Sequence, residues 1–120
     1  MNNIFKQYNN RVLNDDGAYM SEDAKKFAKD FKRRLTFNAK KRGMEVANFS
    51  IGHYYISGFL KKNDKYVYFN YNIPRYYEEI NFFDRNFLIR TAADEKDYHG
   101  GYNNFTNLMN FMDTAEKLLG

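Results

Sequence analysis

The chain has 120 residues, enough for one domain with a modest core, and we expect a single domain over residues 1–120. Its 11 Tyr and 12 Phe make it too aromatic for a disordered protein, and the absence of Cys excludes disulfides and thiolate metal sites. No apolar run reaches membrane-spanning length, and the first residues lack the pattern of a signal peptide. We therefore expect a cytoplasmic protein that uses no cofactor.

The net charge of +4 is unevenly distributed along the chain. Residues 21–42 hold nine Lys or Arg and three acids, a balance of +6. The other residues hold ten basic and twelve acidic side chains, a balance of −2. One segment therefore carries all of the excess positive charge.

Two helices are predicted in the first third of the chain. Residues 3–13 place apolar side chains at helical spacing and predict a short helix, followed by a loop over 14–20. Ser21 is a good N-cap for a long amphipathic helix, and Gly43 is a good residue to end it.

The hydrophobic period changes to two after this helix, and residues 53–73 predict a β-hairpin that turns at Asn63 and Asp64. One register makes one face of the hairpin apolar throughout. This register pairs Leu60 with Val67, Gly58 with Phe69, Ile56 with Tyr71 and Tyr54 with Ile73.

Pro74 cannot donate to a strand ladder and is expected to end the second strand of the hairpin. Residues 86–92 predict a third strand. Apolar residues at helical spacing then predict a C-terminal helix over 105–119, begun by Asn104 or Thr106.

The predicted fold class is α+β, a two-layer α-β-β-β-α sandwich with a three-stranded antiparallel sheet and a short extra N-terminal helix. The segment 75–85 is ambiguous between a long loop and a short helix. This order of elements resembles the double-stranded-RNA-binding domain, although the order alone carries no function.

The basic helix is the first candidate binding surface. Its solvent face would present cations that can track a phosphate backbone, although a solvated helix face has the same pattern. Phe37 projects from the polar side of this helix and would either contact a partner or lie under the N-terminal helix. The candidate cations are Lys25, Lys29, Lys32, Arg33 and Lys40.

The polar face of the hairpin is the second candidate surface. Aromatic side chains on strands bind bases in several single-strand binders, and Tyr is also enriched at protein hot spots. The alternatives are cross-strand pairing that only stabilises the sheet, or cover by the 74–85 segment. The candidate residues are Tyr55, Phe59, Tyr66 and Tyr68.

The two histidines, His53 and His99, have no spacing that resembles a metal-ligand set, so we expect no metal site. Asp97 and His99 could form an Asp–His pair, but no nucleophile stands near them in sequence. We therefore expect no enzymatic activity.

The segment "DEKDYHGGYNN", residues 94–104, separates the third strand from the last helix. Gly100 and Gly101 allow backbone angles barred to other residues, and Asp97 and Asn103 are expected to hydrogen-bond the turn. The Lys and Ser/Thr spacing of a phosphate-binding loop is missing. We regard Asp97, His99, Gly100, Gly101 and Asn103 as a candidate recognition loop.

The segments "FNYNIPRYY" and "FLIRTAADEKDYHGGYNNF" resemble a region of small proteins from phages and mobile elements of AT-rich Gram-positive bacteria. Arg90-Thr91-Ala92 matches the end of a strand in those proteins, and residues 97–103 match an Asp-Tyr-x-Gly-Gly-x-Asn loop. The similarity covers about a third of the chain.

Some proteins of such elements are anti-CRISPR inhibitors, so the resemblance implies a non-enzymatic protein that binds a CRISPR nuclease or its guide-RNA complex. Many such inhibitors are acidic DNA mimics, and the basic helix departs from that pattern. It would better suit contact with guide RNA or with an acidic protein surface. The alternative function is a basic nucleic-acid-binding module of the same elements, and the expected partners are a host protein, a ribonucleoprotein or nucleic acid.

Overall fold

The computed structural model describes residues 5–13, 21–52, 54–75 and 77–120. The predicted loop over residues 14–20 and His53 lie outside these ranges. The described elements are η1 (Lys6–Tyr8), α1 (Glu22–Lys41), β1 (Glu45–Ile51), β2 (Tyr55–Lys62), β3 (Lys65–Asn72), β4 (Phe87–Ala92), β5 (Asn104–Thr106) and α2 (Phe111–Leu119).

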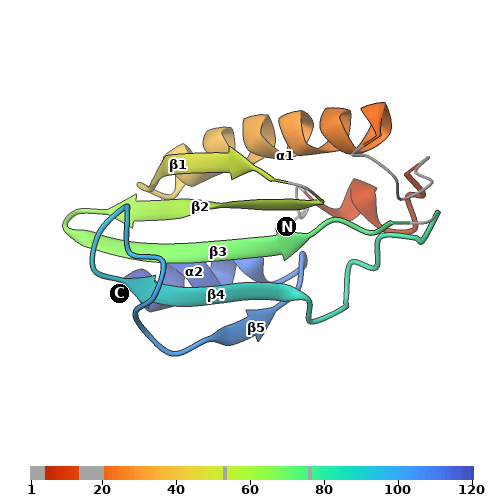
Figure 1. The fold of residues 1–120 in the computed structure, drawn as a ribbon. Coiled ribbons are helices and arrows are strands. Elements are labelled where there is room, and N and C mark those ends of the chain that lie inside the picture. Colours follow the sequence, from red (N-terminus) through yellow and green to blue (C-terminus); the bar gives the residue numbers. More distant parts are fainter. Residues whose placement is uncertain (1–4, 14–20, 53, 76) are drawn as a thin grey trace.

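The fold is α+β, as predicted, with both α-helices on the same face of an antiparallel sheet (Figure 1). The sheet has five strands in the order β1-β2-β3-β4-β5, so the prediction of three strands is wrong. Helix α1 packs along β1, and α2 packs against β3 and β4. The opposite face of the sheet carries no helix and is called the open face below.

Helix α1 begins and ends where the sequence predicts. The Ser21 hydroxyl accepts a hydrogen bond from the Ala24 backbone N–H at 3.1 Å, which satisfies one of the free amides at the helix start. Gly43 follows the helix with φ of +75°, a value that glycine adopts without strain. The predicted apolar stripe is buried and includes Phe27, Phe31 and Leu35.

The β2–β3 hairpin has the predicted register. Leu60 pairs with Val67, Gly58 with Phe69, and Ile56 with Tyr71. The Ile73 N–H donates to the Tyr54 carbonyl at 2.9 Å, which continues this register. Asn63 takes φ of +56° at the turn, and β3 ends before Pro74 as expected.

Strand β1 was missed because its side chains do not alternate regularly. The pairing with β2 shifts between Ala47 and Ser50, and Asn48 has φ of +47° within this irregularity. The shift turns Phe49 toward the core, where its ring lies 6.2 Å from that of Phe69. A β-bulge of this kind hides the period of two in the sequence.

The start predicted for the C-terminal helix is wrong. Asn104–Thr106 form β5 and pair with β4, and the helix begins only at Phe111. Between them, the Asn107 side-chain oxygen accepts a hydrogen bond from the Asn110 N–H at 2.8 Å. Phe105 fits the helical spacing by coincidence. Its conformation is set instead by the pairing of β5 with β4.

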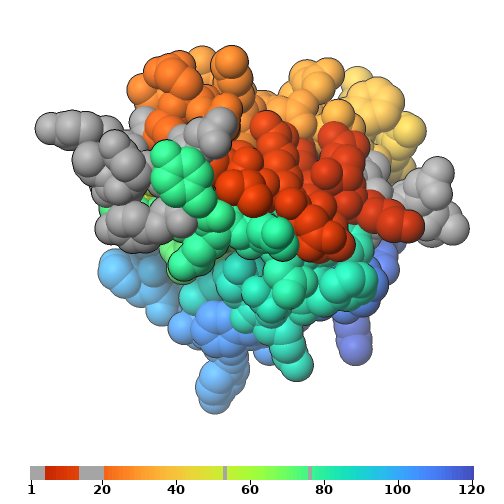
Figure 2. All heavy atoms as spheres, turned by 90° about the vertical axis from the view of Figure 1, so that its right-hand side faces the viewer, coloured from red at the N-terminus to blue at the C-terminus, as the bar shows by residue number. Residues whose placement is uncertain are grey.

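The predicted N-terminal helix is, in its described part, a single 3₁₀ turn, Lys6–Tyr8. The segment after it pairs with the 75–85 segment, which is a loop: the Ile80 N–H donates to the Arg11 carbonyl at 2.9 Å. Figure 2 shows residues 5–13 as a strip lying against α1 and the 75–85 loop. Phe5 and Tyr8 lie in the one core formed by the sheet and both helices.

Candidate functional site

The outer face of α1 presents all five predicted cations, Lys25, Lys29, Lys32, Arg33 and Lys40, in exposed positions. The buried stripe fixes this orientation, because the remaining residues of an amphipathic helix must face solvent. Two further exposed lysines, Lys26 and Lys41, lie on the same helix.

Intramolecular partners divide these cations into two groups. Lys25 lies 3.5 Å from Glu22, and the Lys32 amine lies 5.7 Å from the centre of the Phe49 ring. Lys26, Lys29 and Lys40 have no hydrogen-bond or ion-pair partner among the described residues. These three charges are therefore available to an external anion.

Asp30 is the acid at the middle of this helix, and its charge is already compensated. Its carboxylate accepts hydrogen bonds from Tyr8 at 2.5 Å, Arg33 at 2.6 Å and Arg34 at 2.9 Å. Partial burial alone would raise the pKa of Asp30, but these three donors outweigh it and hold the pKa well below its usual range. Asp30 therefore does not neutralise the free lysines.

Phe37 lies on the same helix with 61% of its surface exposed, so the N-terminal segment does not cover it. The Lys41 amine lies 4.5 Å from the centre of its ring. A shallow hollow of about 410 Å³ lies beside the ring and is also lined by Arg33, Arg34 and Asn38.

The open face of the sheet is less accessible than predicted. Phe59 is completely buried, so its assignment to an exposed aromatic surface is wrong, whereas Tyr55 is exposed and Tyr66 and Tyr68 are partly exposed. The 93–103 loop covers this face at Phe59 and Tyr68. Tyr98 places its ring 5.4 Å from that of Phe59 and 5.8 Å from that of Tyr68, edge to face.

Arg90 and Asn48 hold the 93–103 loop on the open face. Arg90 is only 3% exposed and donates to the Asp97 carbonyl at 2.7 Å, while its guanidinium lies 4.6 Å from the centre of the Tyr68 ring. The Asn48 amide donates to the Glu95 carbonyl at 2.6 Å. Sequence reasoning placed the loop and the sheet face in separate sites, and the structure brings them together.

Asp97 organises the loop from within. Its carboxylate accepts hydrogen bonds from the backbone N–H groups of Ala93 at 2.8 Å, His99 at 3.1 Å and Gly100 at 2.8 Å. These bonds lower the pKa of Asp97 to about 2. The carboxylate meets His99 at its backbone N–H, which is not the imidazole contact that a catalytic Asp–His pair requires.

The two glycines of the loop have different roles. Gly101 has φ of +77°, and a Cβ atom there would lie 2.4 Å from the Thr91 carbonyl oxygen. Gly100 lies close to the Asp97 carboxylate, whose oxygen would be 2.5 Å from an added Cβ. Asn103 is exposed, and the amide that bonds the turn belongs to Asn104, which donates to the Tyr102 carbonyl at 3.1 Å.

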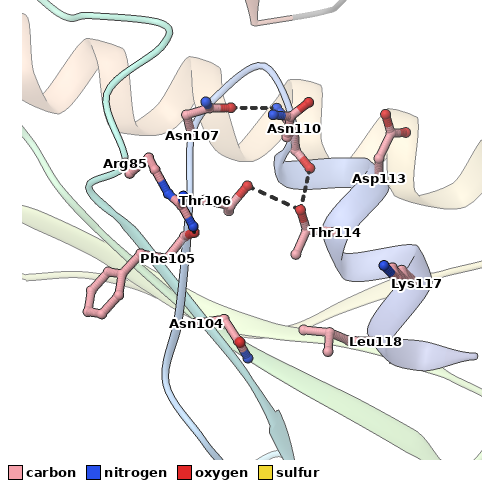
Figure 3. A pocket seen from close by; sticks show the side chains of 10 residues that line it. All are labelled: Arg85, Asn104, Phe105, Thr106, Asn107, Asn110, Asp113, Thr114, Lys117 and Leu118. Carbon is pink, nitrogen blue, oxygen red and sulfur yellow. Dashed lines mark hydrogen bonds between the residues drawn. The ribbon is translucent and has the colours of Figure 1, made fainter.

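A groove of about 730 Å³ lies between β5 and α2, and sequence reasoning missed it (Figure 3). Asn104 and Thr106 face it from β5, and Thr114 and Lys117 from α2. The hydroxyls of Thr106 and Thr114 lie 3.1 Å apart, and Arg85 donates to the Phe105 carbonyl at 3.0 Å. No sequence signal marks the groove, because it forms between two elements, β5 and α2, that only the folded chain brings together in this way.

The described residues contain no group of three or more His, Cys, Asp or Glu that could hold a metal ion. Within the same ranges, neither helix combines the length and apolar character needed to cross a bilayer. Comparisons with protein-family models, with curated proteins and with solved structures found no match. The surface of the molecule is therefore the basis for a functional argument.

Proposed function

We propose that this chain is a non-enzymatic binding protein that engages the phosphate backbone of RNA through the outer face of α1. The observation that supports this most strongly is a set of three exposed lysines, Lys26, Lys29 and Lys40, that have no partner among the described residues. They lie on the helix whose central carboxylate, Asp30, is already compensated. Each lysine that meets a phosphate releases condensed counterions, which is a large source of affinity.

The resemblance to proteins of phages and mobile elements extends the proposal to a biological partner. A CRISPR effector depends on its guide RNA for recognition of the target, so a protein that binds this RNA would inhibit the nuclease without chemistry. The alternative is a nucleic-acid-binding module that acts on free RNA or DNA. Inhibition of a guide-loaded CRISPR nuclease separates the two, because a general module binds RNA without inhibiting cleavage.

A charge-matched pair of variants tests the interface. Replacing Lys26, Lys29 and Lys40 with Gln removes three charges, breaks no hydrogen bond or ion pair among the described residues, and keeps good helix formers. Replacing Lys62, Lys65 and Lys96 with Gln removes the same charge elsewhere on the molecule. Fluorescence anisotropy with a labelled 20-nucleotide single-stranded RNA, from 50 to 300 mM salt, is the measurement.

We expect the α1 variant to bind at least tenfold more weakly. Three lost phosphate contacts should also reduce the slope of log affinity against log salt by about two units. The control variant should keep both quantities close to those of the natural protein. Absence of RNA binding by the natural protein, or an equal loss in both variants, would overturn the proposal.

A further inference from the structure

Arg33, Phe37 and Lys41 form a row along α1 in which an aromatic ring lies between two cations. Residues four apart share one face of a helix, and each step along this row is about 6 Å. The row runs beside the free lysines of the proposed interface. Proteins that bind single strands combine cations that track the backbone with aromatic rings that stack on the bases.

Phe37 has room for a flat partner. Its ring is 61% exposed, and the hollow of about 410 Å³ lies next to it. The Lys41 amine lies over one face of the ring, 4.5 Å from its centre, so a flat partner must stack on the other face. Exposure of the apolar Phe37 ring to water is unfavourable. Stacking against another ring removes this surface from water and is therefore favourable.

Two other residues that line the hollow, Arg34 and Asn38, are polar and are held by hydrogen bonds. The Asn38 amide nitrogen donates to the Arg34 backbone carbonyl at 2.8 Å, which leaves its oxygen directed elsewhere as an acceptor. Arg34 is held by the Asp30 carboxylate at 2.9 Å. The Asn38 amide oxygen is an acceptor suited to the exocyclic amino group of a base that lies on Phe37.

We infer that this hollow receives an unstacked base of a single-stranded nucleic acid. Phe37 stacks on the base with the face that Lys41 does not cover, and Asn38 accepts from the base edge. Arg33, through the N–H groups that Asp30 leaves unused, and Lys41 meet the phosphates on either side. Bases inside a duplex are stacked on each other and cannot reach the ring, so the site selects single strands. This inference rests on the proposed function and specifies which form of RNA the protein prefers.

The test compares Phe37→Leu with the natural protein on two probes, a 12-nucleotide oligoadenylate and a 12-base-pair RNA duplex of mixed sequence. One base stacked on an aromatic side chain contributes about 1–3 kcal/mol, so Phe37→Leu should weaken binding of the oligoadenylate by a factor of about 5 to 150. Duplex affinity and the salt slope should stay unchanged. Phe37→Tyr should restore most of the affinity, and Phe83→Leu, at another exposed ring, should have no effect.

Equal affinity of Phe37→Leu and the natural protein for the oligoadenylate would overturn the inference. The inference would also be overturned if Phe37→Leu lost the same affinity for the duplex as for the oligoadenylate. Either result leaves the proposed function standing if the Lys26, Lys29 and Lys40 variant still loses RNA affinity. If Phe37→Leu binds oligoadenylate normally but no longer inhibits a guide-loaded nuclease, the ring is a protein contact and not a base platform.

Discussion

Single residues with positive φ hold the loop and the sheet together. Asn48 with φ of +47° bulges out of β1 and donates to the loop, and Gly101 with φ of +77° brings the returning chain against Thr91. Asn tolerates the left-handed region better than most residues, and glycine enters it without cost. These two positions let the loop reach back over the strands it leaves.

Gly101→Ala tests how closely the loop must approach β4. The left-handed angle alone costs an L-residue about 1–2 kcal/mol. The added Cβ would also meet the Thr91 carbonyl at 2.4 Å, and backbone cannot move aside as a flexible side chain can. We expect a loss of stability in urea unfolding that exceeds the angular cost by at least about 1 kcal/mol.

Gly43→Ala is the matched control, because Gly43 has a similar φ of +75° but nothing within 4 Å of an added Cβ. The loss of stability in Gly43→Ala should not exceed the about 1–2 kcal/mol that the left-handed backbone conformation costs. If both variants lost the same stability, the loop would have to move away from Thr91 at little cost, and the close contact between Gly101 and Thr91 would not contribute to stability.

At the scale of elements, the 93–103 loop is a docked part of the structure and not a loose connection. Arg90 is buried without a carboxylate partner among the described residues, and its charge is offset by carbonyl oxygens and the Tyr68 ring. Burying a charge is costly unless such groups surround it. The loop supplies the Asp97 carbonyl for this purpose, so loop and sheet stabilise each other.

Acid should loosen this loop through Asp97. Its folded pKa of about 2 lies below the ordinary Asp value of about 3.9, so its contribution to stability is complete above that value and is lost as the pH falls toward 2. We expect the stability difference between the natural protein and Asp97→Asn to shrink between pH 5 and pH 2 in urea unfolding. Asp30 titrates in both proteins, so its effect cancels, and a pH-independent difference would contradict this assignment.

Elements with a regular period were predictable, and those created by tertiary contact were not. The stripe of α1 and the register of β2 and β3 follow from spacing alone, so the exposure of the cations was foreseen. Strand β5 has three residues, too few to display a period, and β1 carries a bulge. The contact of Tyr98 with Phe59 joins residues distant in sequence, so the loss of the open aromatic surface was not foreseeable.

At the scale of the molecule, the N-terminal segment completes the core between the two helices. Phe5 stacks on Phe31 of α1 at 4.8 Å and lies 6.2 Å from Phe111 of α2. Tyr8 bonds Asp30, and burial and this bond raise the pKa of its hydroxyl well above the usual range. A short segment without a regular helix therefore joins both helices of the layer.

Phe5→Ala should lower stability by about 3–5 kcal/mol, since it leaves a cavity among buried rings. Phe83→Ala removes a ring that is 58% exposed and should cost less than about 1 kcal/mol. Thermal or urea unfolding of both variants is the measurement. A small effect of Phe5→Ala would mean that the N-terminal segment adds little to the folded core.

The strand order of the sheet has a consequence for how the protein assembles. Each strand pairs with the next one in the chain, so the sheet can grow by closing short loops, which favours fast folding. The N-terminal segment is the exception, since Asn9 bonds Phe82, 73 residues further on. During synthesis, residues 5–13 are made well before their partners at Ile80 and Phe82, which follow the three strands β1, β2 and β3. Residues 5–13 therefore complete their contacts only after most of the sheet has been synthesised.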